Sequence, residues 1–234
     1  MGKSFYAFFK RTFDFVCSLL ALVVLAPLWL VILIGIKLSS KGPVFYTTER
    51  IGKDKIPFIL YKFRSMHVYQ PDVEGMKSEG GYIANANRIF PFGGFLRASK
   101  LDELPQLFNI LLGQMSIIGP RPIPITSVNR NYVGKYQCIL NVKPGLACLD
   151  SLFDYAHGEL FVSSNEEYKA KVVPMRNELA KMYVEKRSVS LDFHCIFRTL
   201  QLMFQIAVLK KKKFPYSKYE TLAEQALFGE IEKK

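Results

Sequence analysis

One stretch of this chain restricts its fold more than any other. The 22 consecutive residues from Phe15 to Ile36 carry no charge, and Pro27 lies near their middle. As a single helix the stretch would reach roughly 33 Å at about 1.5 Å per residue, which is enough to cross a bilayer. Pro27 removes a backbone donor and therefore predicts a bend at Ala26 and Pro27. We expect a bent, membrane-associated helix.

The residues that flank this stretch bear on the kind of membrane helix it forms. Basic residues both precede and follow it, so the usual asymmetry of lysine and arginine assigns no outer side; they are Lys10, Arg11, Lys37 and Lys41. A re-entrant helix, which enters the membrane, bends and returns to the cytoplasmic side, fits both the charges and the proline. A proline-kinked single span is the alternative. A signal peptide is disfavoured because the run is long and no small-residue cleavage site follows it before Lys37.

The composition narrows the class of partner. The 234 residues suffice for one substantial domain, and the net charge of +12 with a pI near 9.5 predicts an acidic partner. Nucleic acid, an anionic membrane and a phosphorylated small molecule all meet that description. The cysteines have neither a C-x-x-C pair nor a histidine at metal-ligand spacing, so we expect reduced thiols in a cytosol-facing protein; they are Cys17, Cys138, Cys148 and Cys195.

Short strands are predicted after the apolar stretch. Residues 44–46 and 56–63 are rich in β-branched and aromatic side chains, and residues 52–55 supply a turn, so a hairpin is expected. Lys62 and Arg64 alternate with aromatic residues at its end and so share one face. That face is either a solvated strand edge or an anion site. Residues 68–87 are predicted to form a long polar loop.

An acidic pair, Asp102 and Glu103, stands at the start of the next apolar pattern. Leucine and phenylalanine recur at helical spacing from Leu104 to Leu112, and Pro105 is tolerated in the first turn of a helix, which predicts Asp102 near the N-cap. Asp102 then either caps the helix or takes part in chemistry at its positive end, where anions are favoured. In the second case one carboxylate can attack while the other holds a divalent cation.

Candidate cations lie on both sides of the acidic pair. In the turn formed by residues 119–122, two prolines fix the backbone around Arg121 and present its guanidinium group at little entropic cost. A guanidinium suits phosphate, although a surface turn with an incidental arginine has the same sequence. Arg97, five residues before Asp102, is a second cation near the pair.

The order and spacing of these pieces resemble one protein family. The basic amino terminus, the apolar segment broken at proline, and residues 62–66 (KFRSM), 96–107 (LRASKLDELPQL) and 113–122 (GQMSIIGPRP) together resemble the bacterial sugar transferases, which are monotopic phosphoglycosyl transferases. The resemblance covers residues 8–146 well and the rest weakly. It implies an α/β (α+β) fold, mainly helical with a small β-hairpin. Residues 1–41 would form the basic segment and re-entrant helix, and residues 42–234 a cytosolic catalytic domain with amphipathic helices.

The resemblance also implies a reaction. Members of this family transfer a sugar phosphate from a UDP-sugar to a polyprenyl phosphate such as undecaprenyl phosphate, and release UMP, at the bacterial inner (cytoplasmic) membrane. By similarity, Asp102 is the nucleophile that forms a covalent phosphosugar intermediate, and Glu103 with Asp102 holds Mg²⁺. The candidate phosphate contacts are Lys62, Arg64, Arg97 and Arg121.

The sequence departs from the family pattern in three places. Ala26-Pro27 replaces Ser-Pro at the bend, which removes a hydroxyl that could satisfy freed backbone groups. Ala147 and Cys148 stand where Thr-Gly is common, which puts a glycine-dependent loop in question. Cys148 is expected to be buried, with a reactive thiol as the alternative. The carboxyl-terminal region matches weakly, and there Asp192 is a candidate structural or substrate-site residue.

Two helices are predicted in that carboxyl-terminal region. Residues 166–184 have helical spacing, and residues 196–209 form a more apolar pattern followed by four lysines at 210–213. The second helix is either interfacial, with a basic flank, or buried with a solvated tail.

A rival class of function uses the same features without chemistry. A membrane-anchored binding protein would hold acidic lipid or polymer and use Asp102 and Glu103 only as a helix cap. Nucleic-acid binding is not expected, because no groove-reading motif accompanies the charge. The sugar, the polyprenol length, the glycan pathway and the choice between monomer and homodimer stay open.

Overall fold

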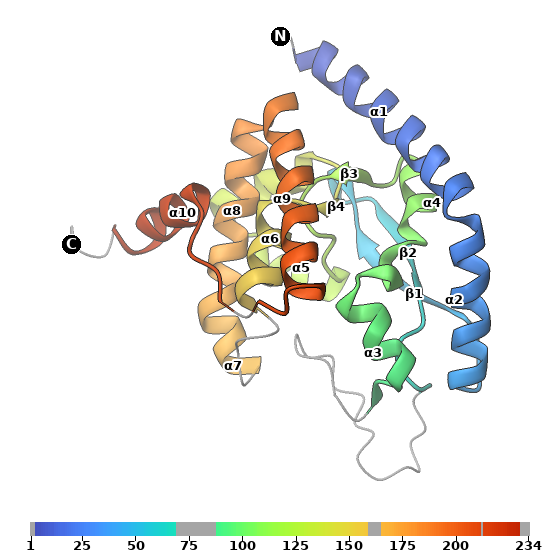
Figure 1. The fold of residues 1–234 in the computed structure, drawn as a ribbon. Helices are drawn as coiled ribbons and strands as arrows, with labels where there is room; N and C mark the ends of the chain where they lie inside the picture. Colours follow the sequence, from blue (N-terminus) through green and yellow to red (C-terminus); the bar gives the residue numbers. More distant parts are fainter. Residues whose placement is uncertain (1–2, 69–87, 159–164, 212, 230–234) are drawn as a thin grey trace.

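The structure, a computed structural model, describes residues 3–68, 88–158, 165–211 and 213–229. Most of the described chain is helical, with an antiparallel hairpin and a pair of short parallel strands (Figure 1), which confirms the predicted class. From residue 69 onward, the loop predicted at 68–87 lies outside the described residues. The helices are α1 (Lys3–Val24), α2 (Ala26–Ser39), α3 (Pro91–Ala98), α4 (Gln106–Leu111), α5 (Ile125–Asn131), α6 (Leu149–Phe153), α7 (Asn165–Glu167), α8 (Val173–Lys186), α9 (Val189–Ala207) and α10 (Lys218–Phe228). The strands are β1 (Phe45–Ile51), β2 (Pro57–Phe63), β3 (Ser116–Ile118) and β4 (Gly145–Ala147).

The apolar stretch near the amino terminus forms two helices that meet at a bend. α1 ends at Val24 and α2 begins at Ala26, with an angle of 63° between them. Pro27 lies in the first turn of α2, where a missing N–H leaves no helical hydrogen bond unmade. The chain therefore bends where the proline predicted. No single described helix is long and apolar enough to cross a membrane, whereas α1 and α2 taken together qualify by length and composition.

The predicted hairpin is present and packs in two directions. β1 and β2 pair antiparallel along their whole length and are joined through a 3₁₀ turn, Lys53–Lys55. Phe63 packs with buried residues of α2 and α3, whereas Phe58 and Leu60 pack with those of α4. The hairpin thus connects the amino-terminal helices to the segment that carries the acidic pair.

The acidic pair lies in a 3₁₀ turn, Leu101–Glu103, between α3 and α4. The prediction of Asp102 near the N-cap of the next helix is wrong in position, because α4 begins only at Gln106 and its N-cap is Pro105. Pro105 has no N–H to continue a ladder of α-helical hydrogen bonds from residue 101, so the tighter turn is completed before α4 starts.

Asn109, which has no exposed surface, fixes α4 against β2. Its Oδ1 accepts a hydrogen bond from the Tyr61 N–H at 3.2 Å, and its Nδ2 donates to the Ile59 carbonyl and to Gln114 Oε1, each at 2.7 Å. Because these bonds hold the two residues that flank position 60, they set the register in which Lys62 meets the acidic turn.

Two glycines allow β3 and β4 to approach closely enough to shape the backbone around Arg121. The strands pair in parallel, and the Gly145 N–H donates to the Pro120 carbonyl at 2.9 Å. A Cβ atom on Gly145 would lie 2.2 Å from the Gly119 nitrogen, and one on Gly119 would lie 2.5 Å from the Lys143 carbonyl oxygen. Only glycine fits at either position without a shift of backbone.

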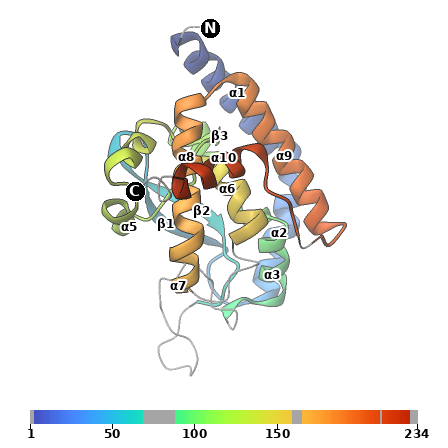
Figure 2. The same cartoon turned by 90° about the vertical axis from the view of Figure 1, so that its left-hand side faces the viewer.

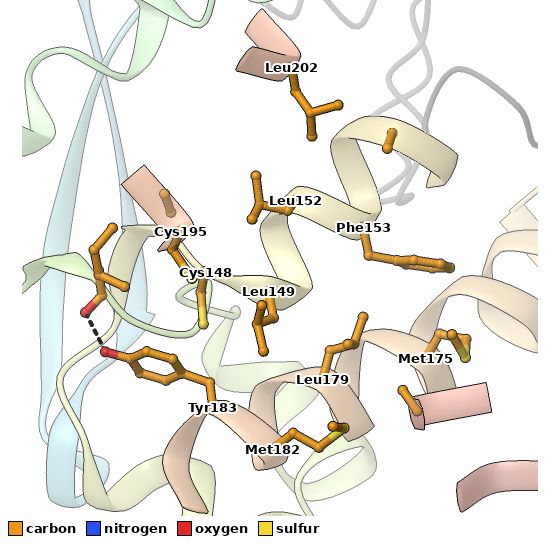
Figure 3. Close-up of a cluster of buried hydrophobic side chains, with 14 of the residues drawn as sticks. Cys148, Leu149, Leu152, Phe153, Met175, Leu179, Met182, Tyr183, Cys195 and Leu202 are labelled. Atoms are coloured by element: carbon orange, nitrogen blue, oxygen red, sulfur yellow. Dashed lines mark hydrogen bonds between the residues drawn. The ribbon is translucent and has the colours of Figure 1, made fainter. Parts of the chain in front are cut away.

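The largest apolar core lies in the carboxyl-terminal half, where α6, α8 and α9 pack together (Figure 3). Cys148 and Cys195 face into this core without exposed surface, and the Tyr183 hydroxyl donates to the Ile118 carbonyl at 3.2 Å. Burial raises the pKa of the Cys148 thiol well above its usual value, which keeps the thiol protonated. The predicted burial of Cys148 is confirmed, and all four cysteines are free.

The carboxyl-terminal helices differ in detail from those predicted. Residues 166–184 fall in α7, a π turn at Tyr168–Val172 and α8. The second helix, α9, begins at Val189 rather than at residue 196, because the Ser188 hydroxyl caps it by accepting from the Leu191 N–H. α10 was not predicted, although Ser217 and Glu220 form a capping box at its start.

α1 contacts the start of α9, where the Tyr6 hydroxyl and Lys10 reach Asp192 (both helices are seen in Figure 2). The rings of Phe13 and Phe193 are in edge contact, with 5.8 Å between centroids. α1 and α2 form one edge of the molecule and α10 lies toward the opposite side (Figure 1). The acidic turn connects α3 to α4, and these two helices pack against α2 and α1 respectively (Figure 1).

Candidate active site

Glu103 is the centre of a buried ionic network. Its Oε1 accepts a hydrogen bond from Lys62 Nζ at 2.8 Å and from Arg121 Nη2 at 3.0 Å. Lys62 comes from β2, Glu103 from the 3₁₀ turn and Arg121 from the turn after β3, so three separate segments meet at one oxygen. Burial alone would raise the pKa of Glu103, but Arg121 and Lys62 outweigh it and hold that pKa well below the usual carboxyl range. Glu103 is therefore ionised.

Asp102 has the opposite environment although it is the adjacent residue. Its side chain is buried, with 5% of the residue exposed, and its Oδ1 has no hydrogen-bond partner within the described chain. Burial raises the pKa of Asp102 and the charge of Glu103 raises it further, whereas the charges of Lys62, Lys100 and Arg97 lower it. A buried carboxylate oxygen without a donor is costly, so its retention calls for an explanation beyond stability.

A cavity of about 510 Å³ lies beside this turn. The charged residues that line it are Arg97, Lys100, Glu103, Arg121 and Asp154. Asp102 is not among the lining residues, although its neighbour Glu103 is. Four of these five charged residues belong to the 96–107 and 113–122 motifs. The volume of the cavity is within the range of small-molecule sites.

Lys100 is a site residue that sequence reasoning missed. Its backbone has φ of 57°, a left-handed conformation that is uncommon for lysine and is found disproportionately at functional sites. Its Nζ lies 4.9 Å from the centroid of the Tyr155 ring, and the Tyr155 hydroxyl donates to the Ala98 carbonyl at 3.2 Å. The position of Lys100 next to the acidic pair was the available signal, since a left-handed lysine leaves no mark in the sequence.

Two of the predicted site residues are placed elsewhere. Arg64 donates to the Ser40 hydroxyl at 2.7 Å and to the Ser40 carbonyl at 2.8 Å, and so closes the end of α2. β2 ends at Phe63, so the alternation that would put Arg64 on the face of Lys62 does not continue. Asp192 accepts from Tyr6, Lys10 and Tyr183 at 2.7–2.8 Å and joins α9 to α1 and α8. The structure does not bring either residue to the acidic pair.

A second group of charged residues holds the backbone of Arg121 in place. Asp150 Oδ2 accepts from the Arg121 backbone N–H at 3.1 Å, and Arg176 lies 3.9 Å from the same oxygen and 3.5 Å from Asp154 Oδ2. Tyr168 donates to Asp154 and accepts from Arg176 at 2.8 Å. Sequence reasoning missed this group because its members come from α6, α8 and two π turns, Asp154–Gly158 and Tyr168–Val172.

The carboxylates of Asp102 and Glu103 suit a hard divalent cation in part. Among the residues that the structure describes, no group of three or more His, Cys, Asp or Glu side chains is arranged to hold a metal ion. Mg²⁺ usually takes only one or two protein carboxylates and fills its other positions with water and substrate phosphates. The unpartnered Asp102 oxygen beside an ionised Glu103 fits that pattern.

Fixed cations and an ionised glutamate thus line a cavity with apolar walls, and a buried aspartate is the neighbour of that glutamate. The chain belongs to the bacterial sugar transferase family, because the model of that family, described as "Bacterial sugar transferase", matches residues 5–206. This match confirms the family that the motifs indicated. It includes residues 8–146, where the resemblance is good, and continues to residue 206.

Curated relatives give names to compare with. A Klebsiella pneumoniae protein named UDP-glucose:undecaprenyl-phosphate glucose-1-phosphate transferase is 36% identical over 194 residues, which cover 82% of this chain and 39% of the relative. An Aeromonas hydrophila UDP-N-acetylgalactosamine-undecaprenyl-phosphate N-acetylgalactosaminephosphotransferase is 32% identical, covering 84% and 44%. A Salmonella typhimurium undecaprenyl-phosphate galactose phosphotransferase is 37% identical, covering 64% and 33%. The chain thus spans less than half the length of these relatives.

Proposed function

We propose that this protein transfers a sugar 1-phosphate from a UDP-sugar to a polyprenyl phosphate and releases UMP, the first step in assembly of a glycan such as a capsule, O-antigen, exopolysaccharide or glycoprotein glycan. The observation that carries the proposal is the buried Asp102 carboxylate, whose Oδ1 has no hydrogen-bond partner within the described chain, beside the Glu103–Lys62–Arg121 network. The names of the relatives support the classes of donor and acceptor. Because those relatives are named for three different sugars, the sugar is left unassigned.

The first half-reaction is a displacement at phosphorus. An Asp102 oxygen attacks the phosphorus that carries the sugar, a P–O bond forms to the carboxylate, and the bond to the bridging oxygen breaks, so that UMP leaves with the electron pair. Arg121, Arg97 and Lys100 line the cavity and are candidates to stabilise the charge that develops on the phosphate oxygens. Lys62 keeps Glu103 ionised and in place.

In the second half-reaction the polyprenyl phosphate is the nucleophile and Asp102 is the leaving group. An oxygen of the polyprenyl phosphate attacks the same phosphorus, and the bond to Asp102 breaks, which restores the carboxylate and releases a polyprenyl diphosphosugar. Each half-reaction forms one P–O bond and breaks one, so no further reactant is needed. Since one nucleophile serves both substrates in turn, ping-pong kinetics are expected.

The metal completes the proposal without changing these steps. Asp102 and Glu103 would hold Mg²⁺, and such an ion, when bound, neutralises diphosphate charge and polarises the phosphoryl oxygens. Removal of divalent cations with a chelator is expected to stop UMP release.

A membrane location follows from the outward faces of the amino-terminal helices. α1 exposes Phe8, Leu20 and Val24 by 57–72%, and α2 exposes Leu30 and Leu38 by 59–83%. Exposed apolar patches of this extent mark a protein or membrane contact, and the flanking basic residues favour anionic lipid. We infer a re-entrant pair, α1 and α2, that enters the inner membrane from the cytoplasmic face and returns to it.

Labelling of single cysteines tests this topology. Cysteines introduced at positions 3 and 41, in a variant that lacks the native cysteines, should both react with an impermeant reagent from the cytoplasmic side only. Reaction from opposite sides would establish a spanning segment instead. A control cysteine that replaces the exposed Tyr216 reports on which side of the membrane the carboxyl-terminal half lies.

The reaction itself is tested by measuring UMP. The protein in membranes or detergent, with Mg²⁺ and polyprenyl phosphate, should release UMP from at least one member of a panel of UDP-sugars. A catalytically silent binding protein would bind acidic lipid under the same conditions and release none. Absence of UMP from every donor, with lipid binding retained, would favour that rival.

A further inference from the structure

The cavity beside the acidic pair is mainly aliphatic. Of its 22 lining residues, 13 are alanine, isoleucine, leucine or methionine. One wall belongs to α9, which contributes Ile196 and Met203, and another to α3 and the segment around α4, which contribute Gly94 and Leu107. The phosphate-handling groups described above make up its charged part.

A uridine and a sugar would be poorly matched to such walls. Their hydroxyl, amide and carbonyl groups lose hydrogen bonds with water on entering an aliphatic space, and that loss is costly unless protein partners replace the bonds. A hydrocarbon chain gains from the same transfer, by about 0.8 kcal/mol for each buried CH₂. The charge distribution therefore favours a ligand with one anionic end and one hydrocarbon end.

We propose that the aliphatic part of this cavity binds the first isoprene units of the acceptor, and that the acceptor's phosphate lies at the Arg97, Lys100 and Arg121 end. This inference rests on the proposed function, and adds to it a subsite for the lipid chain formed by α9 and α3. The nucleotide part of the donor is then held outside the aliphatic walls.

The position of α9 provides a route for the rest of the chain. α9 lines the cavity on one side, while its other side exposes Phe197 by 68% and Phe204 by 56%. The contact between Phe13 and Phe193 joins this outer side to α1. An acceptor chain that leaves the cavity past α9 therefore stays on the apolar surface that α1 continues.

Two neighbouring residues of α9 offer a matched pair of variants. Met203 lines the cavity and Phe204 does not. In Met203→Trp the larger ring should occupy the space of the lipid chain and raise the KM for undecaprenyl phosphate about tenfold, the loss expected when roughly two methylene groups are displaced. The burst of UMP formed without acceptor should be unchanged. Phe204→Trp should change neither quantity.

A variant on the opposite wall of the cavity provides an independent test in case Met203→Trp does not fold. Among the described residues outside its own stretch of helix, a Cβ atom on Gly94 of α3 would approach only Ile89 Cγ2, at 3.8 Å, so a side chain can start there without a clash. Gly94→Leu should also raise the acceptor KM with an unchanged burst. If folded Met203→Trp and Gly94→Leu both lose the burst, or if neither changes the acceptor KM, the proposal is overturned.

A binding experiment separates this proposal from the proposed function. A prenyl phosphate with a diazirine on its first isoprene unit should cross-link to α3 or α9 in Asp102→Asn protein, which needs no turnover. At sub-saturating probe, Met203→Trp should weaken the cross-link about tenfold, while Phe204→Trp keeps it. Cross-linking confined to other elements, or insensitive to Met203→Trp, would overturn the subsite even if wild-type protein releases UMP. Specific cross-linking without any UMP release from the wild type would instead count against the transferase reaction alone.

Discussion

Two buried or half-buried carboxylates of this protein, Asp192 and Asp102, have contrasting surroundings. Asp192 accepts hydrogen bonds from Tyr6 and Lys10 on one oxygen and from Tyr183 on the other, at 2.7–2.8 Å. Asp102 has one oxygen that is fully buried and accepts no hydrogen bond within the described chain. Both residues lie near lysines, so proximity to a cation does not distinguish them. The number of donors that reach the oxygens does.

The difference separates a carboxylate that holds elements together from one that is kept for reaction. Hydrogen bonds to an ionised acceptor are among the stronger ones, so the Asp192 contacts compensate for its partial burial and join α1 to α8 and α9. Asp102 is not compensated in this way, and burial accordingly raises its pKa. Stability and function should therefore respond in opposite ways when each residue is replaced by its neutral isostere.

The largest expected effect is on the chemistry of Asp102. In Asp102→Asn the nucleophilic oxygen is lost, and UMP release should fall at least about a thousandfold, with no phosphosugar adduct detectable by intact mass spectrometry. Because the folded-state pKa of Asp102 is raised above 3.8, its native charge costs stability increasingly as pH rises through that pKa. At neutral pH the variant should thus be as stable as the wild type or more stable, by about 1 kcal/mol.

Near-normal turnover by Asp102→Asn would rule out Asp102 as the nucleophile. Loss of activity together with a much lower unfolding midpoint would assign it a structural role like that of Asp192. Both measurements must therefore be made on the same preparation.

Glu103 should show a large effect on stability as well as on activity. Glu103→Gln removes the charge that pairs with the buried Lys62 and with Arg121, and loss of one partner from such a network costs about 3 kcal/mol of unfolding free energy. The pKa of Glu103 is lowered in the folded state, so its contribution is present above pH 4.5 and is lost as pH falls through the folded value. Denaturant unfolding at pH 7 measures the loss.

The double variant identifies the cause of that loss. Lys62→Met removes the partner left unpaired, so Glu103→Gln combined with Lys62→Met should be less destabilised than the sum of the single variants. Strict additivity would contradict a direct interaction between the two side chains.

A smaller effect, confined to stability, is expected for Asp192. Asp192→Asn weakens its bonds to Lys10 and the two tyrosines and should lower the unfolding free energy by about 2 kcal/mol. The UMP burst per folded molecule should be retained. Lys10→Met is the matched control, since it removes the same ion pair from the side of α1. Loss of the burst in folded Asp192→Asn would instead support the alternative from the sequence, that Asp192 is a substrate-site residue.

The sequence predicted those parts of the site that depend on local chemistry. Pro27 located the bend, alternation located β2 and hence Lys62, and the spacing of the motifs led to the family. It did not place Asp102 correctly, because the separate 3₁₀ turn before α4, which Lys100 precedes in a left-handed conformation, has no signature in the sequence. Arg64 was grouped with Lys62 because the end of a strand, unlike its alternation, is set by tertiary contacts with Ser40.

Contacts between distant segments were beyond the reach of the sequence. The pairing of Asp192 with Lys10 joins residues 182 positions apart, and the support of Arg121 by Asp150 and Arg176 joins three segments. No periodicity or motif encodes such contacts, so a carboxylate that the motifs present as a site candidate can prove to be a structural one.

The smallest effect that sharpens the comparison is a shift in pH dependence caused by Lys100. If Asp102 attacks as a carboxylate, the UMP burst must rise with pH through the raised pKa of Asp102, whereas Glu103 stays ionised over the same range. The charge of Lys100 lowers the pKa of Asp102, so in Lys100→Met the rising limb of the burst should move to higher pH. The variant should therefore lose less of the burst at high pH than at low pH. Lys53→Met, which removes an exposed lysine of the hairpin, is the control for overall charge. A rising limb at the same pH in both variants would mean that the group which titrates is not Asp102.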